Sequence, residues 1–369
     1  MSRKSVLVLL FVIIFVSLQH PRFQQNRVGA SDGYPVHNLN TGLNYTTIQG
    51  AIDANETLDG QTLHIDQGTY LENVTVYKSL SLVGFDRDNT VVDGLQTLSV
   101  FNITADNVKI SELTVRNGVD GMTLYQVTNV TVTNTTISNN DWTGIYLHDS
   151  SYNTIEDNVI ENSSVYEGIV VLGDSNKIEN NNVSHNGYGV MISNSFGNVV
   201  CGNDISNNGF INLELWYSWN TTVTNNNLSN SRYGITQHRS VNDTISGNDI
   251  VNNTYFGIQV EEPQGGTTVF HNNFINNSLS AQISLSGNAT WDDGPLSGGN
   301  YWSDYNGTDA NHDGIGDTPY VIDANNTDHY PLMVQYVIPE FPSFLVLPLF
   351  MVATLLTIVI YKRRHLTRA

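Results

Sequence analysis

The sequence predicts an all-β fold, a single-stranded right-handed parallel β-helix whose coils are 22 to 24 residues long. Apolar residues recur in columns at that spacing, and the stretches that carry them alternate in polarity and are bounded by Gly and Asn. A period of two is typical of strands with one buried face, and stretches of three to five residues are too short for helices. Stacked coils would pair each strand in parallel with its copy in the next coil and join the apolar columns into one core.

Three apolar columns support this prediction. The first is formed by strands that begin at a glycine, or once at an asparagine: Gly121–Leu124, Gly144–Leu147, Gly168–Val171, Gly189–Ile192, Asn212–Leu215, Gly234–Gln237 and Gly257–Val260. The second column holds Ile110, Val132, Ile155, Ile178, Val200, Val223, Ile245 and Val269. The third holds Val115, Ile137, Ile160, Val183, Ile205, Leu228, Ile250 and Phe274. Propellers need longer blades and leucine-rich repeats a Leu-dominated consensus, so both fit less well.

Two columns of asparagine follow the turns between these strands. One holds Asn158, Asn181, Asn203, Asn226, Asn248 and Asn272, and the other holds Asn139, Asn162, Asn207, Asn230, Asn252 and Asn276. Asparagine tolerates the left-handed backbone found at turns, and stacked amides can hydrogen-bond from one coil to the next. We therefore interpret both columns as structural rather than as ligand sites.

The segment before the regular coils predicts an N-terminal capping helix. Thr46–Ile52 has a capping residue and an apolar face. It precedes Gly60–Ile65 and Gly68–Tyr70, which we expect to be the first strands. A helix at this position would cover the open end of the solenoid, where unpaired strand edges invite association.

Both ends of the chain carry patterns of export and anchoring. A basic start followed by the short apolar run Val6–Val16 is typical of a secretory signal peptide, with a cleavage site offered by Val28–Ala30. Phe344–Tyr361 is apolar enough for a transmembrane helix, and the basic residues after it favour a cytoplasmic tail, so the rest faces outward at the cell surface. The expected organisation is a signal peptide (1–30), the β-helix (40–290), a C-terminal cap (291–335), a linker (336–343), a transmembrane helix (344–361) and a cytoplasmic basic tail (362–369).

Composition sets further limits. The chain holds 35 acidic and 15 basic residues, for a net charge of −20. This balance argues against nucleic acid as a partner, because phosphate binding requires clustered Lys and Arg. The single cysteine, Cys201, excludes an internal disulfide and a Cys-based zinc site. Sequons, which in an exported chain are potential glycan acceptors, recur, for example at Asn73, Asn102, Asn129, Asn182, Asn220, Asn242 and Asn288.

Several segments resemble known β-helix proteins. Tyr45–Ile52 and Gly68–Val74 are similar to the start of pectate-lyase-like β-helix proteins. Together with the coil length, they make the chain resemble the NosD-like and the carbohydrate-binding and sugar-hydrolase repeat group. Gly299–Tyr305 with Asp309–Tyr320 resembles the closing segment of archaeal surface members, and Pro339–Phe341 resembles an archaeal PEF-type sorting signal.

This resemblance covers about residues 40 to 365 and implies a fold and a compartment, but no single activity. The fold hosts lyases, hydrolases, epimerases and binding proteins. NosD itself is associated with copper insertion into nitrous oxide reductase. Copper sites favour clusters of Cys, Met and His, whereas this chain has one Cys, 5 Met and scattered His. We therefore do not expect copper as a cofactor.

One local motif, Asp309–Asp317, predicts a structural Ca²⁺ site that locks the C-terminal cap. The ligands expected at loop positions 1, 3, 5, 7 and 9 are Asp309, Asn311, Asp313, the carbonyl of Ile315 and Asp317. Gly314 allows the turn at position 6. Position 12 is Tyr320 rather than a bidentate acid, so Asp323 or Asp304 would have to close the shell. A polar turn without an ion remains the alternative.

Alignment of the coils predicts a binding face. The residue two places after each glycine faces outward, and the residues four and five places after it lie where the strand ends. Neighbouring coils are about 4.8 Å apart, so side chains of successive coils fall beside one another. The carbohydrate-binding residues expected on this face are Tyr146, His148, Glu214, Trp216, Tyr217, Trp219, His238, Arg239, Glu261 and Glu262.

Aromatic rings stack on pyranose faces, and charged groups hydrogen-bond hydroxyls or uronate carboxylates, so this face suits a sugar polymer. Glu214 and Glu261, two coils and roughly 9 to 10 Å apart, stand at the outer limit for an inverting glycosidase pair. His238 and Arg239 are further catalytic candidates. The structural alternative is a surface ion pair between Arg239 and Glu262, with the aromatic rings packed on the sheet.

The sequence thus predicts an exported, membrane-tethered β-helix that binds or scaffolds extracellular glycans and favours a protein without enzymatic activity over an enzyme. The runner-up function is that of a carbohydrate-active enzyme, namely a polysaccharide lyase, hydrolase or epimerase. The third is a NosD-like copper-delivery accessory protein. The sequence leaves open which glycan is bound and whether the chain is oligomeric.

Overall fold

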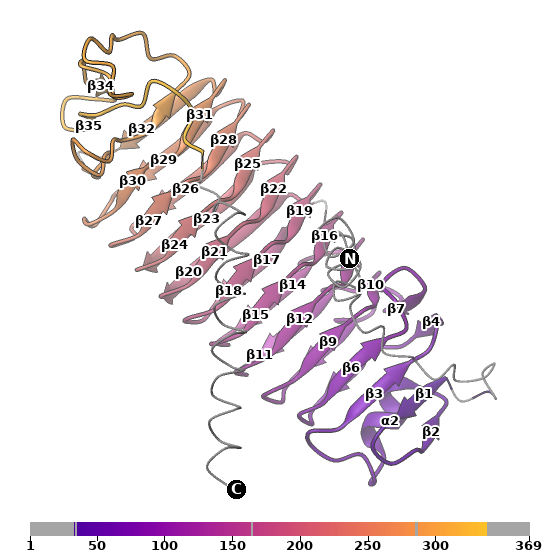
Figure 1. Cartoon of the computed structure of the whole chain (residues 1–369). Coiled ribbons are helices and arrows are strands. Elements are labelled where there is room, and N and C mark those ends of the chain that lie inside the picture. Colours follow the sequence, from indigo (N-terminus) through magenta and orange to yellow (C-terminus); the bar gives the residue numbers. More distant parts are fainter. Residues whose placement is uncertain (1–32, 34, 164, 285–286, 338–369) are drawn as a thin grey trace, which may run out of the picture.

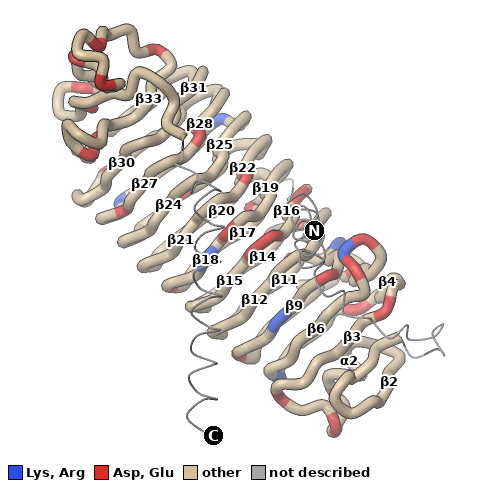
Figure 2. Tube along the Cα trace, in the orientation of Figure 1, with Lys and Arg blue, Asp and Glu red and all other residues tan. Residues whose placement is uncertain are grey.

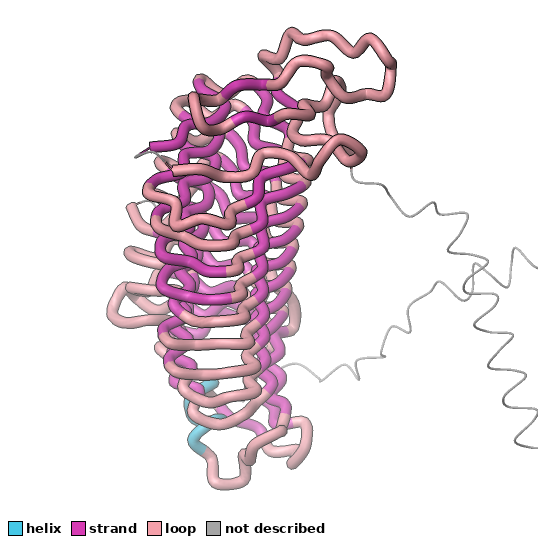
Figure 3. Tube along the Cα trace, turned by 90° about the vertical axis from the view of Figure 1, so that its left-hand side faces the viewer, coloured by secondary structure: helices cyan, strands magenta, loops and turns pink. Residues whose placement is uncertain are grey.

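The computed structural model describes residues 33, 35–163, 165–284 and 287–337, which form a long parallel β-solenoid of the right-handed type (Figure 1). Each regular coil gives one strand to each of three sheets, and the strands stack in columns along the solenoid (Figure 3). The predicted fold class is therefore confirmed. The predicted signal peptide, transmembrane helix and cytoplasmic tail lie outside the described residues. Within the described ranges, no helix is both long and apolar enough to cross a membrane.

The three sheets are named A, B and C. Sheet A contains β1 (Val36–Asn38), β2 (Asn44–Tyr45), β3 (Thr62–Ile65), β6 (Ser81–Gly84), β9 (Lys109–Ser111), β12 (Thr131–Thr133), β15 (Thr154–Glu156), β18 (Lys177–Glu179), β21 (Val199–Cys201), β24 (Thr222–Thr224), β27 (Thr244–Ser246) and β30 (Thr268–Phe270). Sheet B contains β4 (Gly68–Leu71), β7 (Thr90–Asp93), β10 (Thr114–Arg116), β13 (Thr136–Ser138), β16 (Val159–Glu161), β19 (Asn182–Ser184), β22 (Asp204–Ser206), β25 (Asn227–Ser229), β28 (Asp249–Val251), β31 (Asn273–Ile275) and β33 (Tyr301–Trp302). Sheet C contains β5 (Val74–Val76), β8 (Phe101–Ile103), β11 (Met122–Tyr125), β14 (Ile145–His148), β17 (Glu167–Leu172), β20 (Tyr188–Phe196), β23 (Ile211–Trp219), β26 (Tyr233–His238), β29 (Phe256–Glu261) and β32 (Leu279–Ser284).

The three predicted apolar columns become the inner faces of these sheets. In sheet A, Val132 pairs in register with Ile155, and in sheet B, Ile137 pairs with Ile160. These side chains are fully buried. Because each coil repeats the same three short strands, the apolar residues stack coil on coil into one continuous core.

The two asparagine columns are both structural, but for different reasons. In the column of Asn203 and Asn226 the side chains are buried and form a ladder, in which Asn226 Oδ1 accepts the backbone N–H of Asn203 at 2.9 Å. In the other column the residues adopt the left-handed backbone, with φ of 56° at Asn207 and 57° at Asn230. The first column therefore satisfies buried backbone groups, and the second allows the chain to turn.

The glycines at the start of the sheet C strands are required because the neighbouring coil leaves no room for a Cβ atom. A Cβ on Gly234 would lie 2.5 Å from the carbonyl oxygen of Gly257. Asn212 interrupts this glycine column. In the same coil, Ser231 belongs to a third buried ladder, which otherwise runs through Ser163, Asn186, Asn208, Asn253 and Asn277. The two exceptions compensate for each other. A larger residue at 231 would fill the space beside Asn212, whereas Ser231 leaves room for the Asn212 side chain. Ser231 Oγ then donates a hydrogen bond to Asn212 Oδ1 at 2.6 Å.

At the N-terminal end, the helix α2 (Ile48–Asp53) lies beside β1 and β2, and β1 pairs antiparallel with both β2 and β3. Thr47 caps the helix by accepting the N–H of Gly50 at 3.0 Å. Glu72 accepts the N–H groups of Ile48 and Gln49. The short helix expected from the sequence is thus present, and its protective role at the solenoid end remains a prediction.

The C-terminal end is closed by loops and by the antiparallel pair β34 (Tyr320–Val321) and β35 (Thr327–Asp328). The Trp302 ring stacks between the rings of Phe274 and Tyr320, with centroid separations of 4.4 and 4.3 Å. Its indole N–H donates to the buried Asp328 at 2.8 Å. Acidic residues gather in these loops (Figure 2). An aromatic layer therefore seals the last coil, whereas the predicted domain boundaries remain untested.

Candidate functional site

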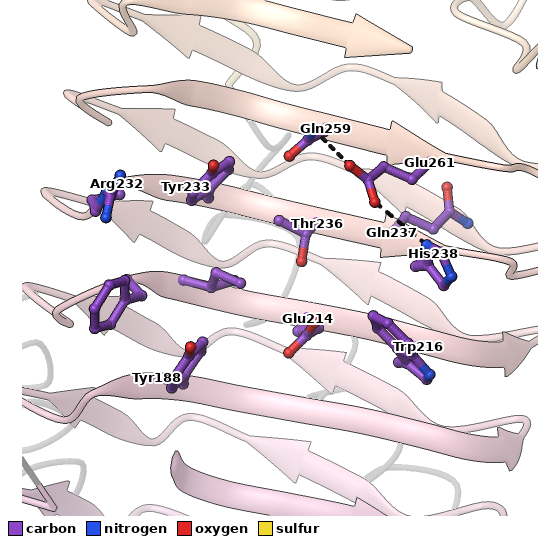
Figure 4. Close-up of a pocket in the computed structure, with 12 residues that line it drawn as sticks. Tyr188, Glu214, Trp216, Arg232, Tyr233, Thr236, Gln237, His238, Gln259 and Glu261 are labelled. Carbon is purple, nitrogen blue, oxygen red and sulfur yellow. Dashed lines mark hydrogen bonds and ion pairs between the residues drawn. The ribbon is translucent and has the colours of Figure 1, made fainter. Parts of the chain in front are cut away.

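A hollow of about 280 Å³ lies on the outer face of sheet C, over β20, β23, β26 and β29 (Figure 4). Here β20 and β23 are nine residues long, against three or four in β5, β8, β11 and β14. The longer strands present more outward-facing side chains on one broad surface. Residues of successive coils form a floor with a wall on either side.

The floor is a row of polar side chains that runs along the solenoid. Glu214 pairs in register with Thr236, and Thr236 with Gln259, as the coil alignment predicts. Glu214 is half-buried and has no hydrogen-bond partner among the described residues. Burial raises the pKa of the Glu214 carboxyl, and the carboxylates of Glu167 and Glu261 raise it further. Thr236 Oγ1 is buried without a hydrogen-bond partner, so a small rotation of its side chain would let it, like the Glu214 carboxyl, meet a bound molecule.

One wall is formed by Trp216 and His238, whose rings stack with centroids 4.2 Å apart. Trp216 is 37% exposed, so part of the ring remains open to a ligand. His238 Nδ1 lies 3.4 Å from Glu261 Oε2, within ion-pair distance but without the alignment of a hydrogen bond. Gln259 donates to the other carboxylate oxygen of Glu261 at 2.9 Å. The sequence predicted this wall, and the structure brings its residues together.

The opposite wall is formed by Tyr188, Phe210 and Tyr233, and sequence reasoning missed it. Tyr188 and Phe210 stack with centroids 5.4 Å apart, and the Arg232 guanidinium lies 5.5 Å from the Phe210 ring centre. These residues lie one or two places before the glycine, or Asn212, at which each sheet C strand was taken to begin. The coil alignment considered only the residues that follow this position, so it could not include them. The recurrence of aromatic residues just before that position was the signal that could have revealed them.

The expected residues Tyr217, Arg239 and Glu262 lie at a corner just beyond the hollow and do not line it. All three adopt the left-handed backbone, with φ of 49°, 47° and 46°. Arg239 forms an ion pair with Glu262 and donates to the Tyr217 hydroxyl. Those bonds raise the pKa of the Arg239 guanidinium and lower the pKa of the Glu262 carboxyl. The ion pair that the sequence offered as a structural alternative is therefore present.

Trp219 lies beyond this corner, where it pairs in register with Phe196, and it does not line the hollow either. Tyr146 and His148 form a separate cluster in β14, three coils before β23, with ring centroids 5.6 Å apart. Val170 lies in β17, between this cluster and the hollow. The coil alignment predicts that its side chain faces outward, but the side chain is only 8% exposed. The predicted face is thus divided into a main hollow and a smaller aromatic cluster.

Two carboxyl groups of the hollow have the positions proposed for acid and base. Glu214 lies in β23 and Glu261 in β29, with β26 between them, so they are two coils apart. A carboxyl group whose pKa is raised keeps its proton to a higher pH than usual, as a general acid requires, and a second carboxyl group nearby could serve as a base. This arrangement permits acid–base chemistry, while the same side chains also suit binding alone.

The segment Asp309–Asp317 folds back on its first residue, as a cation loop does. The Asp309 carboxylate accepts the N–H groups of Asp313 at 3.2 Å and of Gly314 at 3.0 Å. Of the two acids expected to close the shell, Asp304 accepts the hydroxyl of Tyr320 instead. Within the described ranges, no three His, Cys, Asp or Glu side chains come close enough together to hold a metal ion.

The other residue predicted to close the calcium shell, Asp323, accepts hydrogen bonds from Asn325 and Asn326.

The metal-binding side chains of this protein fit copper poorly. Cys201, the single thiol of the chain, is half-buried on sheet A, and burial and the Glu179 carboxylate raise the pKa of its thiol. A raised pKa disfavours the thiolate that binds soft metals, so no step through copper follows from these residues.

The chain matches one family model over residues 48–213 and 211–307, and that model is described as periplasmic copper-binding protein (NosD). It is 29% identical over 246 residues to a cell surface glycoprotein of Methanothermus fervidus. The match covers 56% of this chain and 39% of that protein, so the chain spans well under half the length of its curated relative.

Solved structures share the architecture. An alginate lyase from Paenibacillus sp. str. FPU-7 superposes with a TM-score of 0.51 at 17% identity, over 66% of this chain and 94% of the lyase. The pectate lyase Pel9A superposes with a TM-score of 0.51 at 18% identity, over 68% of this chain and 76% of the lyase. At such identities, the likeness shows the fold alone.

Proposed function

This chain belongs to the family described as periplasmic copper-binding protein (NosD), and we propose that this member is an extracellular protein that binds glycan chains in the hollow on sheet C. The observation that carries the proposal is the hollow itself, an open Trp216 ring facing aromatic residues across a polar floor. Apolar ring faces beside unpartnered polar atoms match a sugar, which presents both C–H faces and hydroxyls.

Two further observations support an extracellular setting. The family is described as periplasmic, and the relative from Methanothermus fervidus is named a cell surface glycoprotein. The predicted signal peptide and the predicted membrane anchor agree with this compartment, and both remain predictions from the sequence. We propose that the partner is a polysaccharide or surface glycan and that the membrane is contacted through the C-terminal segment.

Replacing Trp216 with Ala is expected to weaken glycan binding by roughly thirtyfold, because losing one buried aromatic contact costs about 2 kcal/mol. Affinity electrophoresis of the purified full-length chain in gels containing different polysaccharides measures this change. Trp219→Ala is the matched control, since it removes a similarly exposed ring from the same strand outside the hollow. Equal losses in the two variants would exclude the hollow as the binding site.

The second candidate function is that of a carbohydrate-active enzyme, favoured by the raised pKa of Glu214 two coils from Glu261. Incubation of the protein with the same polysaccharides distinguishes the two functions. Release of reducing ends or unsaturated uronates that stops in Glu214→Gln would favour the enzyme. Retention of the polymer without any product would favour the binder. Copper delivery, the third function, requires stoichiometric copper on the purified chain.

We also propose that Ca²⁺ binds the loop Asp309–Asp317 and stabilises the C-terminal cap. Two backbone amides already hold the Asp309 carboxylate in the loop, which orients one of the expected ligands. Chelation is expected to lower the melting temperature of the full-length chain by a few degrees. Asp313→Ala should abolish the difference between chelated and Ca²⁺-loaded protein. An unchanged melting curve on chelation would contradict the proposal.

A further inference from the structure

Two acidic side chains, Glu214 and Glu261, line the hollow on sheet C, and a third, Glu167, lies two coils before Glu214, in β17. Among the described residues, neither Glu167 nor Glu214 forms an ion pair with a Lys or Arg side chain. Burial raises the pKa of both carboxyl groups, and the carboxylates of Glu167 and Glu261 raise the pKa of Glu214 further.

The groups that can carry positive charge lie on the walls or beyond the hollow rather than at Glu214. Arg232 is on one wall, over the ring of Phe210, and His238 is on the other, beside Glu261. Arg239 lies at the corner beyond the hollow and is paired with Glu262. A bound uronate carboxylate on the floor would therefore face the Glu214 carboxylate, and an unpaired buried charge is strongly unfavourable.

The floor suits sugar hydroxyls instead. The Glu214 carboxylate offers acceptor oxygens without a partner among the described residues, and Thr236 Oγ1 can donate or accept. Sugar hydroxyls both donate and accept, so they can satisfy each of these groups. A neutral sugar thus brings no second negative charge beside Glu214.

The walls also indicate how a chain would lie. Glu214, Thr236 and Gln259 come from successive coils, and the walls flank this row on both sides (Figure 4). A glycan resting on the floor between the walls would run along the solenoid axis, across the strands. Neighbouring sugar units would then contact neighbouring coils.

From this geometry we infer that the hollow binds chains of uncharged sugars along the solenoid axis and excludes polyuronates. The inference rests on the glycan-binding proposal and narrows its substrate class. It separates this chain from the alginate and pectate lyases that share its fold, whose names refer to acidic polymers. Like-charge repulsion is expected to weaken polyuronate binding at least about tenfold relative to a neutral glycan.

Affinity electrophoresis of the full-length chain tests this inference, with laminarin and mannan as neutral probes and polygalacturonate and alginate as acidic ones. Each gel is run with and without Ca²⁺, because a divalent cation could bridge two carboxylates. We expect retention by a neutral polymer and none by the polyuronates in either condition. Two outcomes would overturn the charge inference but leave glycan binding intact. One is that a polyuronate retains the protein as strongly as the neutral polymers do. The other is that a polyuronate retains the protein only when Ca²⁺ is present. Retention by no polymer would end both proposals.

The double variant Glu214→Gln, Glu261→Gln gives an independent check. It removes two carboxylates from the hollow and is expected to strengthen polygalacturonate binding roughly tenfold relative to the native chain. Glu179→Gln on sheet A is the control, because it removes one acid from a different sheet. An equal gain in the control would show a general effect of net charge and overturn the inference. The comparison of polymers on the native chain stands even if the double variant does not fold.

Discussion

Replacing Asn226 with Ala is expected to lower the free energy of unfolding by roughly 3 to 5 kcal/mol, because several buried polar groups would lose their partners at once. Asn226 is 1% exposed. Its Oδ1 accepts the backbone N–H of Asn203 and the Asn203 side-chain amide, each at 2.9 Å. Its Nδ2 donates to the carbonyl of Val200 at 2.9 Å. Alanine would leave the backbone N–H of Asn203 without its partner, and the Asn203 side-chain amide and the Val200 carbonyl would each lose one hydrogen bond.

Urea unfolding of the full-length chain measures this effect. Asn227→Ala is the matched control, because the adjacent amide bonds only to the exposed Asp204 and its loss should cost less than about 1 kcal/mol. Equal destabilisation by the two substitutions would contradict the structural role assigned to the buried ladder. A small effect of Asn226→Ala would show that water or a backbone shift satisfies the exposed groups.

Asp243→Asn is expected to stabilise the protein at pH 8 by roughly 2 to 3 kcal/mol and to leave it nearly unchanged at pH 4. Burial raises the pKa of the Asp243 carboxyl to about 6. The folded state therefore binds this proton more tightly than the unfolded state. Stability consequently falls as the pH rises from about 4 to about 6, and it stays lower above that range.

The amide can keep most of the hydrogen bonds of the carboxyl group. Its oxygen can accept the N–H of Thr221, as Oδ1 of Asp243 does at 2.8 Å. Its N–H groups can reach Ser218 Oγ and, after a flip of the Gln237 amide, Gln237 Oε1. The flip moves the Gln237 N–H groups to a position without a partner, which offsets part of the gain at every pH. Thermal unfolding at a series of pH values measures the outcome.

Asp328 is a second buried carboxyl group with a pKa raised to about 6 by burial. The pH dependence of Asp243→Asn should therefore be about half that of the native chain rather than absent. Parallel profiles for the native chain and the variant would show that Asp243 does not titrate in the folded state as described. Asp328 does not line the hollow, whereas Asp243 accepts a hydrogen bond from Gln237, which does.

The columns of the fold could be predicted because a solenoid repeats one local rule. Once Val132 and Ile155 were aligned, the register of every neighbouring strand followed, and the structure pairs those residues as expected. The two kinds of asparagine were less distinguishable. Asn226 and Asn230 lie four residues apart in one turn, and only the three-dimensional structure shows that the first is buried and the second has a positive φ.

The candidate site could be predicted in part. Glu214, Trp216 and His238 lie after the start of their strands, where the side-chain alternation is regular, and the structure brings them into one hollow. The corner residue Arg239 could not be placed. A left-handed backbone is uncommon for such residues, so its chemistry gave no sign of the turn that directs it away from the floor.

The paired exceptions at Asn212 and Ser231 have a consequence for how such a protein can change. A deletion of residues 212–233 would remove one 22-residue repeat together with both exceptions. Asn208 would then meet Asn253, and the strand-opening positions from Gly121 to Gly257 would all be glycine. The same repeat carries Glu214 and Trp216. Duplication or exchange of this one repeat could therefore change the floor and one wall of the hollow while the coils on either side keep their glycine and asparagine contacts.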